Sequence, residues 1–169
     1  MALNRGKGMI IGGLIAGIVV VVVAAVSAGV LDGLFKISPA ESAITAGVVE
    51  TADAVKIPLK ALDSGKALLL SLESDGRRLY YFALKSRDGA YRAALDACDV
   101  CFQSNRGYRQ EGDLMVCNNC GQSFPSDRIG EIKGGCNPHP LARGIDGPHL
   151  VIKKADIVSR KDYFARNRS

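Results

Sequence analysis

The sequence predicts a mainly β fold, a small β-rich domain with a loop-rich cysteine site, together with one N-terminal transmembrane helix. Three observations predict this fold class. Beyond residue 47, short apolar runs alternate with turns that contain glycine and aspartate, as in sheets of short strands. Residues 9–31 carry no charged side chain, a length of apolar chain sufficient to cross a bilayer as a helix. All five cysteines lie between residues 98 and 136, which indicates one sulfur site within the β domain.

The apolar segment 9–31 is expected to be a membrane anchor. Arg5 and Lys7 precede it, so the positive-inside bias puts residues 1–8 in the cytoplasm and the C-terminal domain outside the cell membrane. A cleaved signal peptide is the alternative, but the apolar region of a signal is usually only about 7–15 residues long. Glycines in and just before the segment have a spacing that would allow self-association of transmembrane helices. These are Gly8, Gly12, Gly13 and Gly17.

The rest of the chain divides into a linker, a domain and a tail. Residues 32–46 are predicted to be the linker, in which Ser38-Pro39-Ala40-Glu41 is typical of a helix start. Residues 47–155 form the predicted β-rich metal-binding domain, and residues 156–169 a short basic tail. The tail is expected to dock on the domain through its apolar residues. Strands are predicted at 48–49, 54–59, 67–73, 78–85 and 149–153.

The middle of the domain gives the clearest strand pattern. Ser74-Asp75-Gly76 separates two apolar runs and predicts a hairpin. Residues 79–84 are apolar on both faces, which indicates a central strand that is covered on each side. A turn at 86–89 then leads to residues 90–95, which fit either a strand end or one helical turn.

Composition and charge exclude several classes of function. The formal net charge of +5 is modest, and basic residues are scattered among acids, so a nucleic-acid partner is not expected. The sequence contains no recognisable catalytic triad, carboxylate pair or phosphate-binding loop. We therefore expect a carrier or binding protein rather than an enzyme.

The cysteines form two Cys-x-x-Cys units and one further cysteine. Cys98 and Cys101 make the first unit, and Cys117 and Cys120 follow after fifteen intervening residues. This spacing is typical of a four-sulfur metal site, because two intervening residues let the chain curl until both thiolates point at one ion. In the second unit, Gly121 can take the positive φ that closes such a knuckle.

The fifth cysteine, Cys136, lies in Gly134-Gly135-Cys136-Asn137-Pro138. It is expected either to replace one of the other four ligands or to bind a second metal. An iron–sulfur cluster is the favoured cofactor, zinc and copper are alternatives, and disulfide or thiol-redox use is a further possibility. Covalent haem is excluded because neither unit is followed by histidine. His139 is an additional candidate metal ligand, although a lone histidine before proline is more often structural.

Four segments of the sequence are specific in combination: Asp96-Ala97-Cys98-Asp99-Val100-Cys101, Gly107-Tyr108-Arg109-Gln110-Glu111-Gly112-Asp113, Cys117-Asn118-Asn119-Cys120-Gly121 and Gly134-Gly135-Cys136-Asn137-Pro138. Together they resemble the FtrD-like membrane iron–sulfur proteins, over roughly residues 57–153. The resemblance implies a prokaryotic, membrane-anchored electron carrier of iron–sulfur type, linked to iron transport with a membrane permease as partner. Larger members carry several transmembrane helices before this domain, whereas one is expected here, so the resemblance supports an electron-transfer or metal-binding domain more than a direct role in transport.

Two functions are therefore expected, from different classes. In the first, an outward-facing domain on a single-pass anchor holds a thiolate-bound redox metal and transfers electrons to or from a membrane redox or iron-transport partner. In the second, the sulfur site is structural zinc or disulfide, and the domain is a surface binding or assembly module without a redox role.

Overall fold

In the computed structural model, the described residues are Pro39, Ala43 and 46–165. All of them belong to Ser38–Ser169, the second of two units into which the chain divides. The predicted cytoplasmic segment 1–8, the anchor 9–31 and most of the linker lie outside the described residues. Within the described part of the chain, no helix has the length and apolarity needed to span a membrane.

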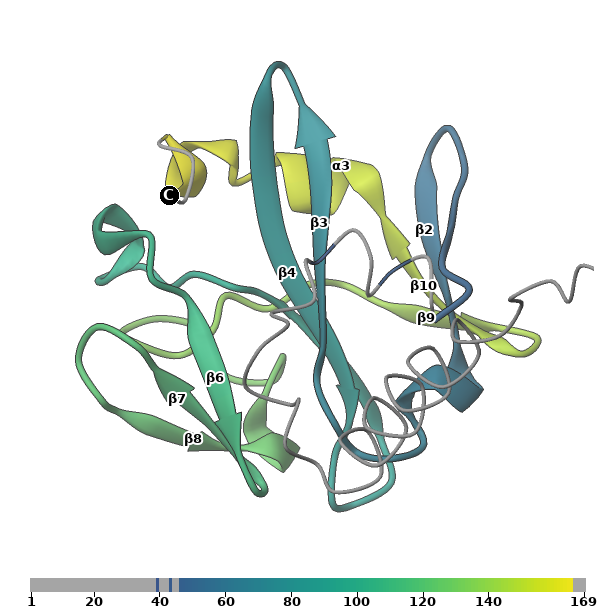
Figure 1. Cartoon of the computed structure of the whole chain (residues 1–169), viewed down its shortest axis with the longest axis horizontal. Helices are drawn as coiled ribbons and strands as arrows, with labels where there is room; N and C mark the ends of the chain where they lie inside the picture. The colour runs from purple at the N-terminus through teal and green to yellow at the C-terminus, as the bar shows by residue number, and fades with distance from the viewer. Residues whose placement is uncertain (1–38, 40–42, 44–45, 166–169) are drawn as a thin grey trace, which may run out of the picture. The chain divides into compact units, whose positions relative to one another are not determined.

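The described domain is mainly β, as predicted, and its strands form three antiparallel sheets (Figure 1). The first sheet has the order β1 (Val49–Glu50), β2 (Ala54–Pro58), β10 (His149–Lys153) and β9 (Gly144–Asp146). The second consists of β3 (Leu68–Ser74), β4 (Arg77–Lys85) and β5 (Tyr91–Leu95), and the third of β6 (Tyr108–Glu111), β7 (Leu114–Cys117) and β8 (Ser123–Pro125). Short helical turns lie between strands at η1 (Leu59–Leu62), η2 (Phe102–Ser104) and η3 (Ser126–Arg128), and α3 (Lys154–Val158) and η4 (Lys161–Phe164) follow the last strand.

Strand β4 is the central strand that its sequence predicted. It pairs with β3 on one side, through the expected hairpin at Asp75 and Gly76, and with β5 on the other. Since side chains alternate across a strand, its two faces enter two different clusters. Leu79 and Tyr81 pack in the larger cluster with β2 and β10, whereas Phe82 lies in a smaller cluster that contains cysteines. The strand therefore joins the structural core to the sulfur site.

Residues 90–95, for which two conformations were compatible with the sequence, form strand β5. The third sheet and strand β9 were not predicted. Figure 1 shows β6, β7 and β8 gathered as a separate small sheet beside the long β3–β4 hairpin. This sheet carries the second Cys-x-x-Cys unit, because β7 ends at Cys117 and β8 begins at Ser123.

The C-terminal segment packs on the main core. Ile157 of α3 is fully buried, and Tyr163 and Phe164 of η4 are 9% and 1% exposed. The ring of Phe164 lies 6.0 Å from that of Tyr80 in β4, centroid to centroid. The apolar residues of the tail thus belong to the domain, which matters because Tyr163 also reaches the first cysteine unit.

A buried arginine connects β5 to the segment before Cys136. The guanidinium of Arg92, which is 6% exposed, donates to Glu131 Oε1 at 2.6 Å and to Asp88 Oδ2 at 2.7 Å. Arg143 donates to the same Glu131 oxygen at 2.7 Å. Arg143 first, and Arg92 after it, hold the pKa of Glu131 below its usual value. This network fixes the start of the arm that carries the fifth cysteine.

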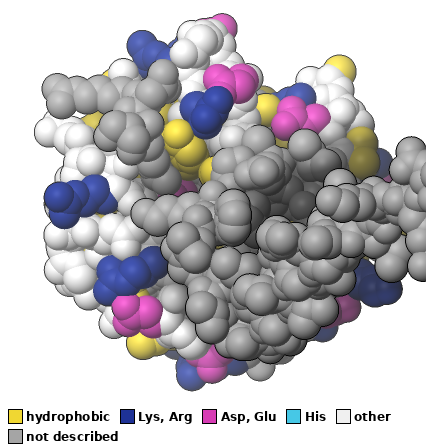
Figure 2. Space-filling view, in the orientation of Figure 1, with side chains coloured by type: hydrophobic (Ala, Val, Ile, Leu, Met, Phe, Trp, Pro, Cys, Tyr) yellow, Lys and Arg dark blue, Asp and Glu magenta, His cyan; other side chains and the backbone are white. Residues whose placement is uncertain are grey.

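Charged side chains of both signs share the described surface. On the face drawn in Figure 2, Lys and Arg side chains lie interspersed with Asp and Glu. Several of them form exposed ion pairs, such as Lys56 with Asp146 at 2.9 Å and Lys85 with Asp63 at 3.0 Å. Such pairs contribute little to stability because water screens them.

Candidate metal centre

The first Cys-x-x-Cys unit forms a turn directly after β5. The backbone N–H of Cys101 donates to the Sγ of Cys98 at 3.1 Å, which closes the turn around that sulfur. The chain then enters η2 at Phe102 and takes its left-handed residue at Asn105, with φ of 52°. The unit therefore closes without a glycine after its second cysteine, and Phe102 is free to stack elsewhere.

The second unit is a tighter knuckle between β7 and β8. The Sγ of Cys117 accepts hydrogen bonds from the backbone N–H groups of Cys120 and Asn119. Gly121 has a φ of 75° and donates its N–H to the carbonyl of Cys117 at 2.9 Å. The predicted positive φ is confirmed, and a β-carbon there would meet no atom within 4 Å, so backbone conformation alone favours glycine.

The third element is the loop that carries Cys136. Gly134 and Gly135 both have positive φ, of 97° and 61°, and Asn137 donates through its side chain to the Gly134 carbonyl at 3.0 Å. The buried Tyr108 on β6 donates its hydroxyl to the carbonyl of Cys136 at 2.6 Å. Tyr108 therefore ties this loop to the sheet that bears the second knuckle.

The sulfur atoms of the three elements come together in one place. The Sγ of Cys136 lies 3.7 Å from that of Cys101 and 3.7 Å from that of Cys120. Two groups of thiols have all their sulfurs within 4.8 Å of one another, and Cys101 belongs to both. These groups are Cys98, Cys101 and Cys136, and Cys101, Cys117 and Cys120. All five thiols are free in the structure, and such a set can hold a soft metal ion.

The site is buried on one side and open on the other. Cys98 and Cys117 are 1% and 2% exposed, whereas Cys120 is exposed. Burial raises the pKa of the Cys117 thiol to about 11 and raises that of Cys136 further. The pKa of Cys120 is lowered, above all because the backbone N–H of Gln122 donates to its sulfur. A metal that binds here must displace protons from the buried thiols, so binding is pH-dependent.

A polar network supports the first unit from the C-terminal segment. The hydroxyl of Tyr163 donates to Asp99 Oδ1, and the Nδ1 of His139 lies 3.3 Å from the same oxygen. Tyr163 also stacks on Phe102, with ring centroids 4.9 Å apart and planes at 21°. Asp99 lies between the two cysteines of the unit, so this network holds the Cys98–Cys101 loop against the core.

The structure brings together all five cysteines that the sequence indicated, and it adds residues that the sequence did not. His139 is outside both thiol groups and its Nδ1 faces Asp99. Asn119 donates through its side chain to the Sγ of Cys101 at 3.4 Å, across the two knuckles. Tyr163 is 64 positions from its partner Asp99, so no local signal could have revealed the contact.

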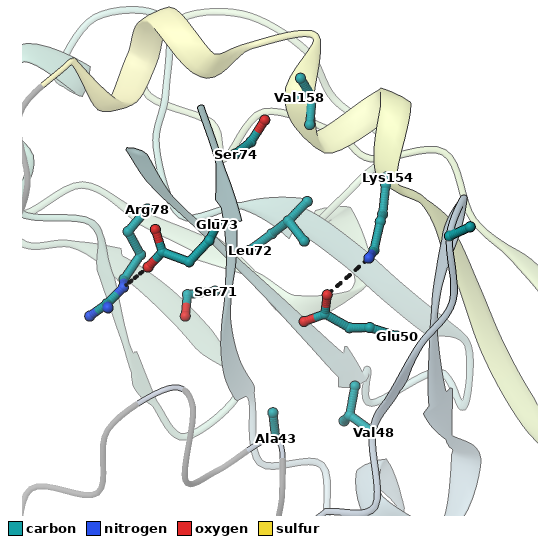
Figure 3. Close-up of a pocket in the computed structure, with 11 residues that line it drawn as sticks. Ala43, Val48, Glu50, Ser71, Leu72, Glu73, Ser74, Arg78, Lys154 and Val158 are labelled. Atoms are coloured by element: carbon teal, nitrogen blue, oxygen red, sulfur yellow. Dashed lines mark hydrogen bonds and ion pairs between the residues drawn. The ribbon is translucent and has the colours of Figure 1, made fainter. Parts of the chain in front are cut away.

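A separate pocket of about 740 Å³ lies beside the β3–β4 hairpin and away from the cysteines (Figure 3). Leu72, Val48 and Val158 supply apolar walls. Glu50 and Lys154 form an ion pair of 3.0 Å across it. Its lining contains no cysteine.

Fold and site together define a small β domain with a cluster of thiols able to bind a metal. Comparison with protein families identifies the group to which it belongs. The family described as membrane iron-sulfur containing protein FtrD-like matches residues 62–164, more than half of the chain, and the chain is a member of that family. The resemblance seen in the sequence is confirmed, and the match extends through η4. Searches of curated proteins and of solved structures returned no match.

Proposed function

We propose that this protein is a membrane-anchored electron carrier whose cysteine thiolates hold a redox-active iron centre. A thiolate-bound iron exchanges single electrons, with a potential set by hydrogen bonds to the sulfurs and by solvent exposure. The convergence of five free thiols, two pairs of them 3.7 Å apart, is the observation that carries the proposal. The family description, membrane iron-sulfur containing protein, supports the choice of iron.

The protein's own groups would tune that centre. Backbone N–H groups donate to the sulfurs of Cys98, Cys117 and Cys120. Such hydrogen bonds stabilise negative charge on the sulfurs, so they would favour the reduced, more negative state of a bound iron. Asn119 adds a donor to the Cys101 sulfur. The exposed Cys120 offers the shortest route for an electron to a partner that docks on that side.

The setting of the domain is part of the proposal. Residues 9–31 would anchor it to the cell membrane by a single pass, with the domain on the extracytoplasmic side. A membrane redox protein or an iron-transport permease would be the electron partner, which links the carrier to iron handling. Self-association through the glycine-spaced anchor is compatible with this arrangement.

Anaerobic purification of the full chain, followed by absorption spectroscopy and metal analysis, tests the proposal. The expected result is a coloured protein that contains iron and bleaches reversibly when a reductant and then an oxidant are added. A matched control is the variant in which Cys101 and Cys120, the two thiols closest to Cys136, are both replaced by serine, which should be colourless. Colourless wild-type protein that contains stoichiometric zinc, or no metal, would contradict electron transfer.

Structural zinc is the second candidate function of the same site. The spacing of 3.7 Å between sulfurs also fits a tetrahedral zinc ion, whose role would be to stabilise a surface binding or assembly module. Zinc has no redox chemistry, so the same purification separates the two functions. Protein that keeps zinc when it is grown with excess iron would support this alternative.

A further inference from the structure

The distances between the sulfurs carry information on how many metal ions they can surround. Cys136, Cys101 and Cys120 come from three different loops, and two sides of the triangle formed by their sulfurs measure 3.7 Å. The third side, between Cys101 and Cys120, is at most 4.8 Å. The three thiols therefore form a compact triangle in which Cys136 bridges the two knuckles.

A triangle of this size is one face of a small tetrahedron of ligands. Four sulfurs that surround one ion at bond lengths of about 2.3 Å lie about 3.8 Å from one another, because a tetrahedral edge is about 1.6 times the bond length. The two measured sides agree with this edge.

A bridged cluster needs a different spacing. In a four-iron cluster each thiolate binds its own iron and lies on the outside of the cluster. The distance between two thiolate sulfurs therefore includes the iron–iron distance and the outward component of two iron–sulfur bonds, and it is well beyond 4.8 Å. In a two-iron cluster the thiolates form two pairs at opposite ends. Here Cys136 is equally close to both knuckles, and Cys101 shares a group with both Cys117 and Cys120, so no division into two distant pairs exists.

The geometry points to a single metal ion in a tetrahedral site of four thiolates, with Cys136 as a ligand beside Cys101 and Cys120, and not to a bridged iron–sulfur cluster. This inference rests on the proposed function for the identity of the metal as iron, but not for the number of ions. The fourth ligand comes from one of the two buried thiols. Cys98 belongs to the group with Cys136, and Cys117 to the group with Cys120.

The remaining buried thiol is then surplus to the tetrahedron. Cys98 and Cys117 each accept a backbone N–H in their own unit, so either can stay in place without a metal bond. A site of five thiols with four ligand positions can lose one of these two and still complete its shell. Loss of Cys136 should matter more, because its sulfur lies 3.7 Å, the tetrahedral spacing, from one sulfur of each knuckle.

Reconstitution of the full chain in detergent, under argon and with ferrous iron and sulfide both in excess, tests the number of ions. The expected result is one iron per chain, no acid-labile sulfide and, after oxidation, the electron paramagnetic resonance signal of a single high-spin ferric ion. Two or four irons per chain with equal acid-labile sulfide would overturn the inference while leaving the proposed redox function intact. One zinc per chain in protein that refuses iron would overturn the function and leave the single-ion site standing.

Titration with Co²⁺ tests the ligands independently of the natural metal. Wild-type protein should saturate at one equivalent, with the visible bands of a tetrahedral ion and thiolate charge transfer that corresponds to four sulfurs. The variants C101S, C120S and C136S should each lose about a quarter or more of the charge-transfer intensity, whereas at least one of C98S and C117S should retain all of it. Circular dichroism of each variant separates ligand loss from misfolding. Full intensity in C136S, with loss in both C98S and C117S, would assign the site to the two knuckles alone and overturn the role of Cys136.

Discussion

Replacement of Tyr163 by phenylalanine should weaken metal binding without disturbing the core. The variant removes the hydroxyl that donates to Asp99 but keeps the ring that stacks on Phe102 at 4.9 Å. Asp99 lies between Cys98 and Cys101, so without the Tyr163 hydroxyl the loop that carries these two cysteines is held less firmly in the metal-free protein. The bound metal must then order that loop itself.

The expected loss in binding free energy follows from the contribution of one hydrogen bond to a charged group, about 1.5–3 kcal/mol. Asp99 is 35% exposed in its side chain, so water replaces part of the lost donor and roughly half of the value remains. The remaining loss of about 0.8–1.5 kcal/mol corresponds to about four- to twelvefold weaker binding. Competition with a chromophoric chelator, with Co²⁺ or Zn²⁺ as the metal, measures this change directly.

Tyr91 provides a matched control for the same experiment. Its hydroxyl also donates to an aspartate, Asp63, at 3.2 Å, but on an exposed surface at the far end of β5 from the cysteines. Y91F should bind the metal as tightly as wild type. An unchanged affinity in Y163F, or an equal loss in both variants, would refute the idea that Tyr163 organises the first cysteine unit.

Three further outcomes are expected. Gly130→Ala should lower the free energy of unfolding by about 2–5 kcal/mol in a denaturant titration, because the new β-carbon would lie 2.9 Å from the Ala93 carbonyl oxygen at a φ of 75°. Gly112→Ala is the control: its φ is 57° but the space around it is open, so the loss should be only about 1–2 kcal/mol. The stability that Glu131 contributes is present above its unfolded pKa of about 4.5 and is lost as pH falls through its lowered folded pKa. The melting temperatures of E131Q and wild type should therefore converge at acid pH. A difference in melting temperature that stays constant with pH would exclude this role. Removal of the metal with a chelator should lower the melting temperature. It should also allow alkylation, followed by mass spectrometry, first at the exposed Cys120 and last at the buried Cys98 and Cys117. Equal labelling rates at all five cysteines would contradict the burial of Cys98 and Cys117.

The central strand and its hairpin could be predicted because their signals are local. An unbroken apolar run at residues 79–84 requires cover on both faces, and β4 does separate two clusters. Strands β6, β7 and β8 escaped prediction because they are only three or four residues long. In addition, β6 and β8 mix polar and apolar residues without a clear alternation. Their pairing is determined by the turn at Gly112 and the knuckle after Cys117, and not by any periodicity of their own.

The site could be predicted as a set of residue types but not as a geometry. Confinement of five cysteines to one stretch indicated a common site, and the spacing within each unit indicated knuckles. That Cys136 lies between the two units depends on the Gly134–Gly135 turn and on the hydroxyl of Tyr108. The glycines could be seen beside Cys136 in the sequence, but the Tyr108 contact joins positions 28 apart, and the spacing of the cysteines carries no information on it.

X-ray absorption at the iron edge, on protein purified anaerobically from membranes, tests the central claim most directly. If the thiols hold a redox-active iron, the iron should have a first shell made only of sulfur, at about 2.3 Å, in both oxidised and reduced samples, and its edge should shift reversibly between them. Absence of iron, or a shell of oxygen and nitrogen with no sulfur, would contradict the claim that these thiols hold a redox-active iron.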